Sequence, residues 1–117
     1  YLPSIDTPTS KAFQANFKAR TGRVGSEFAA QGYDTAKLIF EALKLTGGAT
    51  DDKMAFIEAM HSVKVTGTRG PLRIDRKTNN VIQDMYIFET KKMGGKVGYT
   101  ILDTIKEVRD APKGCKL

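Results

Sequence analysis

AAQGYDTAKLIFEALKL, residues 29–45, is the longest helical pattern in this chain of 117 residues. Its apolar side chains recur in steps of four, three, four and three, at Ala29, Tyr33, Ala36, Phe40 and Leu43. Further apolar side chains lie on other faces of the same helix, at Leu38, Ile39, Ala42 and Leu45. The pattern predicts a helix that is buried on two sides and ends at Gly47-Gly48.

A shorter helix is predicted on the N-terminal side, over residues 11–20. Ser10 or Thr7 suits its N-cap, because a hydroxyl oxygen can accept a hydrogen bond from a free backbone N–H of the first turn. Gly22 is well placed for the left-handed residue that commonly follows a helix. Residues 25–28 are then expected to be a linker to the next helix.

A third helix is predicted from Thr50 to about Ser62. Asp51 and Asp52 suit its start, because carboxylates interact favourably with the positive end of the helix dipole. Its inner face is expected to contain Met54, Ile57 and Met60.

Strand patterns follow the helices. Leu72 and Ile74 alternate with charged residues, and residues 76–80 are polar and predict a turn. Residues 81–90 are rich in β-branched and aromatic side chains, and Gly94-Gly95 predicts a hairpin turn into a return strand that contains Val97, Tyr99 and Ile101. Three helices followed by a strand pair are too few elements for a complete parallel sheet. The chain is therefore either a small α+β domain or a piece of a larger sheet.

The composition is that of a globular protein, with 40% hydrophobic and 27% charged residues. The formal net charge is +6, but the basic residues are spread from Lys11 to Lys116 without a block, as on a solvated surface. Cys115 is the single cysteine, so it is either a free thiol or paired outside this sequence. The chain opens without a methionine or a signal peptide, and we expect a fragment or a processed product.

Signals for catalysis or metal binding are sparse. His61 is the only histidine, and its place near the end of the third helix suits a structural role beside the negative helix terminus. One histidine and one distant cysteine cannot supply a zinc site. We therefore expect no enzyme, no metal and no cofactor.

Gly67-Thr68-Arg69-Gly70 matches the GXXG loop with which KH domains clamp a nucleic-acid backbone. With the basic charge, it supports an alternative function as a small nucleic-acid-binding module. The context disagrees, because the KH loop joins two helices, whereas Pro71 and a strand follow here. The favoured interpretation is a turn that leads into the strand.

SEFAAQGYDTA, residues 26–36, resembles the C-terminal part of branched-chain amino-acid-binding proteins, which are type I periplasmic binding proteins of ABC importers. Other landmarks follow in the family's order over nearly the whole chain: KAF at 11–13, FKARTG at 17–22, GG at 47–48, RGPLRID at 69–75, QDMYI at 83–87 and GGK at 94–96. The resemblance implies an α/β, periplasmic-binding-protein-like type I fold, of which this chain is a C-terminal fragment.

The family fold has two α/β lobes with the ligand in the cleft between them. By resemblance, residues 1–24 belong to the second lobe, residues 25–75 supply first-lobe helices and a crossover, and residues 76–117 return to the second lobe. A chain that holds pieces of two lobes is expected to expose apolar surface, which the missing N-terminal part of the same protein covers.

The resemblance implies a periplasmic solute-binding component of an ABC importer, with no chemical step and no nucleic-acid partner. Ligand stabilises the closed lobes, and the closed form docks on the permease subunits. The cleft residues expected here are Phe28, whose aromatic counterpart walls the ligand in relatives, and its neighbours Ala29 and Gln31. Tyr33 is expected in the core. The expected ligand is a hydrophobic amino acid, an amide or an aromatic acid, and a sensor domain on the same fold is an open alternative.

Overall fold

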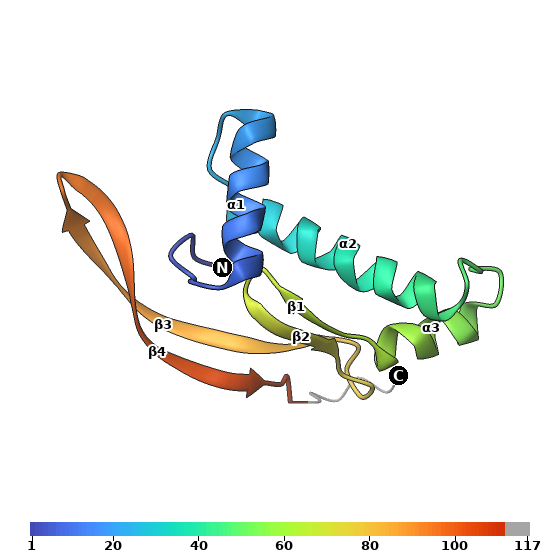
Figure 1. Cartoon of the computed structure of the whole chain (residues 1–117). Helices are drawn as coiled ribbons and strands as arrows, with labels where there is room; N and C mark the ends of the chain where they lie inside the picture. Colours follow the sequence, from blue (N-terminus) through green and yellow to red (C-terminus); the bar gives the residue numbers. More distant parts are fainter. Residues whose placement is uncertain (112–117) are drawn as a thin grey trace.

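The structure is a computed structural model that describes residues 1–111, and it contains three helices followed by a four-stranded antiparallel sheet (Figure 1). The strands lie in the order β1-β2-β3-β4. The elements are α1 (Pro8–Thr21), α2 (Glu27–Leu45), α3 (Lys53–Ser62), β1 (Lys64–Gly67), β2 (Gly70–Ile74), β3 (Val81–Met93) and β4 (Lys96–Val108). The predicted order of helices before strands is confirmed, and β1 is a strand that the sequence pattern did not predict.

The helices begin where a side chain satisfies the free backbone N–H groups of the first turn. Thr7, Ser26 and Asp52 are the N-caps of α1, α2 and α3, and each side-chain oxygen accepts the N–H of the residue three positions later. The helices therefore start at Pro8, Glu27 and Lys53 rather than at the predicted positions 11, 29 and 50. Gly22 ends α1 with a φ of 70°, a left-handed conformation that costs glycine little.

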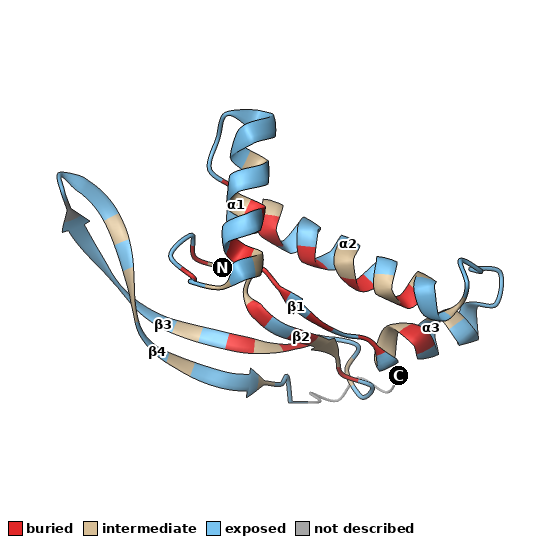
Figure 2. Ribbon diagram, viewed as in Figure 1, coloured by how far each residue is buried: buried red, intermediate tan, exposed pale blue. Residues whose placement is uncertain are grey.

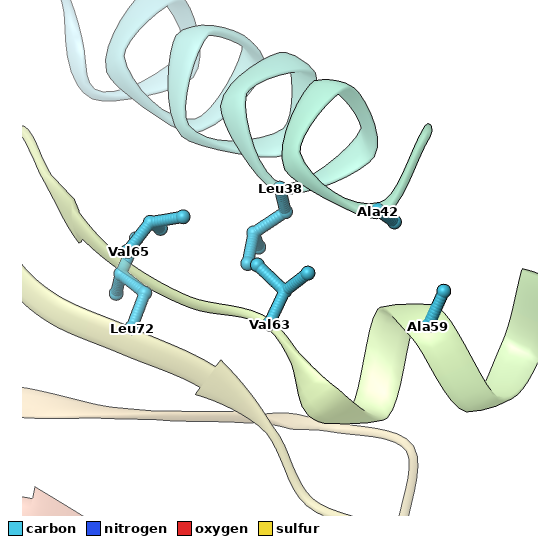
Figure 3. Packing of buried hydrophobic residues seen from close by; sticks show 6 residues of the cluster. All are labelled: Leu38, Ala42, Ala59, Val63, Val65 and Leu72. Carbon is cyan, nitrogen blue, oxygen red and sulfur yellow. The ribbon is translucent and has the colours of Figure 1, made fainter. Parts of the chain in front are cut away.

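The hydrophobic core lies where α2 and α3 pack on β1 and β2. Leu38 is 4% exposed and Leu72 is 2% exposed, and both belong to one buried cluster with residues of α2, α3 and β1. Figure 3 shows the buried cluster, formed by Leu38, Ala42, Ala59, Val63, Val65 and Leu72. The β1–β2 hairpin thus supplies the surface on which both helices rest.

The prediction that α2 is buried on two sides is wrong for this chain. Its buried face consists of residues four positions apart, Ala30, Asp34, Leu38 and Ala42. Tyr33, expected in the core, is 42% exposed, and Phe40 is 63% exposed, because α2 packs on the sheet with one face only. The predicted inner face of α3 is wrong in part for the same reason, since Met54 and Ile57 are exposed.

β3 and β4 form a long ribbon that extends beyond the helices (Figure 1). Gly94 and Gly95 connect the strands with φ values of 57° and 81°, and a two-residue type I′ turn needs both to be positive. The predicted hairpin is confirmed, although both strands are longer than expected. Irregularities near Asp84 and Ile87 shift the register of the ribbon, and such bulges bend a strand and increase its twist.

The molecule is elongated, and many of its residues are exposed (Figure 2). Its radius of gyration is 16.4 Å, whereas a compact chain of this length has one of about 13 Å. Large exposed apolar side chains gather on α2, α3 and the ribbon, among them Phe28, Ile39, Phe40, Leu45, Met54, Ile87, Phe88, Val97 and Leu102. The expected exposure of apolar surface is therefore present.

Two further expectations concern the ends and the membrane. Cys115 lies outside the described residues, so its pairing stays a prediction. None of the helices within residues 1–111 combines the length and the apolar character needed to cross a membrane.

Truncating Leu38 to alanine tests the position of the core. We expect Leu38→Ala to lower the free energy of unfolding by about 2–5 kcal/mol, because it removes buried contacts and leaves a cavity. Leu45→Ala is the matched control on the same helix, since Leu45 is 62% exposed, and it should cost less than about 0.5 kcal/mol. Urea unfolding of the 117-residue chain, followed by circular dichroism, measures both values. Equal losses would contradict this assignment of the buried face.

Candidate ligand-binding site

A hollow of about 710 Å³ lies between the N-terminal segment, the start of α2, the β1–β2 turn and the ribbon. Five aromatic side chains line it: Tyr1, Phe28, Tyr86, Phe88 and Tyr99. Charged and amide side chains also reach it, among them Gln31, Arg69 and Asp84. An aromatic wall with a few polar groups is the usual lining of a small-molecule site.

The N-terminal wall of the hollow is held in place by Gln14 on α1. Its amide binds the backbone of Gly25 twice, since Nε2 donates to the carbonyl at 3.0 Å and Oε1 accepts the N–H at 2.9 Å. The same Nε2 donates to the hydroxyl of Tyr1 at 2.7 Å. Gly25 allows this close approach, because a Cβ there would lie 2.6 Å from the ring of Phe13. These contacts position the linker just before α2 begins.

The three predicted site residues lie on the first turns of α2 but differ in their surroundings. Phe28 is 74% exposed and lines the hollow. Gln31 is exposed and also lines it. Ala29 is half-buried and does not line the hollow, although its N–H bonds to the Ser26 cap. A ligand-binding role for any of them stays a prediction.

Asp34 joins α2 to the β1–β2 turn from a fully buried position. Its Oδ1 accepts the backbone N–H of Thr68 at 2.6 Å, and its Oδ2 accepts the Thr68 hydroxyl at 3.0 Å. Nε of Arg69 lies 3.2 Å from Oδ2. A buried carboxylate needs such partners, since an isolated one is strongly destabilising.

Arg69 is held from a second direction by the ribbon. The hydroxyl of Tyr86 donates to the backbone carbonyl of Arg69 at 2.8 Å. Burial raises the pKa of Tyr86, and the nearby charge of Asp84 raises it further, so the hydroxyl stays protonated as a donor. The turn that carries Arg69 is therefore fixed between α2 and β3.

Asp84 marks the register shift in β3, where its buried carboxylate binds the neighbouring strand. Oδ1 accepts a hydrogen bond from the backbone N–H of Glu107 at 3.0 Å, and Oδ2 accepts one from Nζ of Lys106 at 2.8 Å. Burial raises the pKa of Asp84, but these two hydrogen bonds and the Lys106 charge together outweigh it and hold the pKa below its ordinary value. The hydrogen bond to Asp84, followed by its charge, raises the pKa of Lys106.

The other candidate sites that the sequence offered make contacts that belong to the fold. His61 lies in the last turn of α3, where Nε2 is 2.8 Å from Oδ1 of Asn79. Gly67-Thr68-Arg69-Gly70 forms the turn between β1 and β2, as the favoured interpretation predicted, and does not join two helices. Within residues 1–111, no three His, Cys, Asp or Glu side chains gather closely enough to hold a metal ion.

The relationship of the chain to known proteins agrees with this architecture. The Periplasmic binding protein family matches residues 1–96. The chain belongs to the periplasmic binding protein family. Its fold is the mixed α/β, type I fold of the periplasmic binding proteins that serve ABC transporters, as predicted.

Curated relatives of this periplasmic binding protein chain are considerably longer. Leu/Ile/Val-binding protein homolog 6 of Brucella abortus is 29% identical over 94 residues, which make up 79% of this chain and 24% of the relative. The chain thus spans about a quarter of the length of the curated relatives that it matches.

Solved structures of similar proteins include complexes with aromatic acids. A solute-binding protein of an ABC transporter from Rhodopseudomonas palustris BisB5, in complex with 3,4-dihydroxybenzoic acid, is 34% identical with a TM-score of 0.84, and the match covers 94% of this chain and 30% of that one. Another solute-binding protein from R. palustris, in complex with benzoate, is 30% identical with a TM-score of 0.85. That match covers 100% of this chain and 31% of the other. An ABC transporter substrate-binding protein from Sphaerobacter thermophilus is 27% identical with a TM-score of 0.85. That match covers 92% of this chain and 29% of the other.

Sequence reasoning did not assign to the ligand cleft several side chains that shape the hollow, notably Gln14, Asp34, Arg69, Tyr86 and Asp84. One of them left a signal in the sequence. Asp34 lies in the buried stripe with Ala30 and Leu38, and a carboxylate in an apolar stripe needs a partner. The partner itself was not visible, because Thr68 is 34 residues away.

Replacing Asp84 by asparagine tests the lowered pKa. Because the folded pKa lies below the unfolded one, the carboxylate stabilises the fold above the unfolded pKa, and this contribution is lost as the pH falls through the folded pKa. We expect wild type to exceed Asp84→Asn in unfolding free energy at neutral pH, and the difference to shrink below about pH 4. Urea unfolding across this range measures it. Asp103→Asn, which alters an exposed carboxylate on β4, is the control. A difference that does not change with pH would contradict the assignment.

Proposed function

We propose that this chain forms part of the ligand cleft of an extracytoplasmic solute-binding protein, which delivers a small organic carboxylate to an ABC importer. The observation that carries the proposal is the hollow, where five aromatic side chains converge with a few polar ones. Its volume of about 710 Å³ lies within the range of small-molecule sites. Membership of the periplasmic binding protein family supports this role.

The ligand class that we propose is an aromatic acid or an amino acid. The aromatic lining favours a ligand with a flat or apolar part. An aromatic ring of the ligand could make edge-to-face or offset contacts, which aromatic pairs prefer, with several of these side chains. Phe88 and Tyr99 already form such a pair, with ring centres 5.5 Å apart and planes at 88°. The benzoate and 3,4-dihydroxybenzoate complexes of similar proteins support an aromatic acid, and the Leu/Ile/Val-binding relative supports an amino acid.

The proposed mechanism is capture by closure of two lobes, without a chemical step. Residues 25–75 are assigned to one lobe, and residues 1–24 and 76–117 to the other. The hollow receives side chains from all three ranges, for example Tyr1, Phe28 and Tyr86. A ligand that contacts both lobes stabilises the state in which they approach, because only that state offers all the contacts. The closed form then docks on the permease.

Ligand binding is testable by thermal unfolding of the full-length protein that contains this chain. We expect benzoate, 4-hydroxybenzoate or leucine to raise the unfolding midpoint, since a ligand at a hundred times its Kd adds about 2.7 kcal/mol to the folded state. Benzyl alcohol and isoamylamine, which lack a carboxylate, serve as controls. The proposal fails if no carboxylate shifts the midpoint while salt-sensitive binding to RNA or DNA is found.

Replacing Phe28 by alanine tests the site itself. We expect Phe28→Ala to weaken the ligand identified above by about tenfold or more, because an aromatic contact and its buried area are lost. Phe40→Ala is the matched control, since Phe40 is on the same helix and 63% exposed but does not line the hollow, and its effect should stay within about twofold. Isothermal titration calorimetry measures both. Equal affinities of wild type and Phe28→Ala would exclude Phe28 from the site.

A further inference from the structure

We propose that Gln14 is a positioning residue of the ligand site, because it holds the ring of Tyr1 and the start of α2 in the arrangement that the ligand meets. The inference rests on the proposed function, since Tyr1 and Phe28 line the same hollow. Gln14 lies on α1 and is not among the residues that line the hollow. It therefore acts through these two neighbours and not by touching the ligand.

The side-chain amide of Gln14 joins two segments of the chain at one point. Its Nε2 has two N–H groups to donate, and it donates to the hydroxyl of Tyr1 at 2.7 Å and to the carbonyl of Gly25 at 3.0 Å. Its Oε1 accepts a hydrogen bond from the backbone N–H of Gly25 at 2.9 Å. This pairing fixes the orientation of the amide, because the reverse orientation would place oxygen against oxygen at the Gly25 carbonyl.

The ring of Tyr1 is held by α1 through further contacts. Its hydroxyl oxygen lies 3.1 Å from Oγ of Ser10. Because Gln14 donates to that oxygen, the hydrogen of the Tyr1 hydroxyl is free to be donated to Ser10. The ring also meets the ring of Phe13 edge-on, with centres 6.0 Å apart and planes at 88°. Ser10 and Phe13 are buried residues of α1, so α1 sets the orientation of this aromatic wall.

Gly25 connects Gln14 to Phe28. It directly precedes Ser26, whose side chain caps α2 by accepting a hydrogen bond from the N–H of Ala29. Phe28 lies in this first turn, three residues after Gly25. A shift of Gly25 would therefore move the cap and the ring of Phe28 with it.

A role in folding alone gives a different expectation. If Gln14 only stabilised the fold, its loss would lower the unfolding midpoint and leave the affinity of the folded protein unchanged. If Gln14 positions Tyr1 and Phe28, its loss weakens binding, because the ligand must then order these side chains itself. Affinities measured well below the unfolding midpoint separate the two roles, since nearly all of the protein is then folded.

The experiment measures binding to Gln14→Met by calorimetry on the full-length protein that contains this chain. The ligand is benzoate, or leucine if the wild type binds leucine instead. Methionine has a similar shape but makes none of the three hydrogen bonds, and we expect it to weaken the ligand by about five- to thirtyfold, as for one or two side chains that must be ordered on binding. Asn16→Leu is the matched control, since it removes an exposed amide of α1 outside the hollow, and it should change affinity by less than about twofold.

A double-mutant cycle with Phe28→Ala tests the route by which Gln14 acts. Residues that act through one another have effects that do not add. Once the ring of Phe28 is absent, Gln14→Met should cost at least about threefold less in affinity than it does in the wild type. A loss of stability alone would not produce this difference.

Gln14→Glu keeps an acceptor for the Gly25 N–H but loses the donors to Tyr1 and to the Gly25 carbonyl, and it replaces Gln14→Met in the cycle if that variant does not fold. A folded variant that binds like the wild type, or equal losses with and without Phe28, would overturn the inference while leaving the proposed function intact. A wild-type protein that binds neither benzoate nor leucine would overturn the proposed function and this inference together.

Discussion

The buried carboxylate of Asp34 is the contact on which the arrangement of the hollow depends. It lies on the face of α2 that packs on the sheet, and it binds Thr68 through both the backbone and the hydroxyl. Gly67 makes room for it, since a Cβ at that position would lie 2.6 Å from Oδ1. Because burying an unpaired carboxylate is so unfavourable, α2 and the β1–β2 turn are held in one relative position.

The two sides of the hollow are joined to one another by different kinds of contact. α2 and the β1–β2 turn share the core around Leu38 and the Asp34 contacts. The ribbon joins them through the short pairing of β2 with β3 and the hydrogen bond from Tyr86 to Arg69.

The exposed apolar surface and the elongated shape occur together in this chain. The chain spans about a quarter of the length of its curated relatives, and it exposes large apolar side chains on α2, α3 and the ribbon. The outer face of α2 shows this directly. Phe40 belongs to the helical repeat and Leu45 to the apolar side chains on the other faces, which together predicted a helix buried on two sides, yet both are more than 60% exposed. That a further part of the same protein covers this outer face stays a prediction.

The sequence by itself determined the features that depend on neighbouring residues. A cap at Thr7 or Ser10, the left-handed Gly22, the Gly94-Gly95 turn and the order of helices before strands follow from local sterics and hydrogen bonding, and the family resemblance follows from ordered short motifs. Only the tertiary structure decided which face of α2 is buried and that Asp34 meets Thr68 and Arg69. The reason is physical: these contacts join residues about 34 positions apart, and their energy comes from burial and charge pairing that no local pattern encodes.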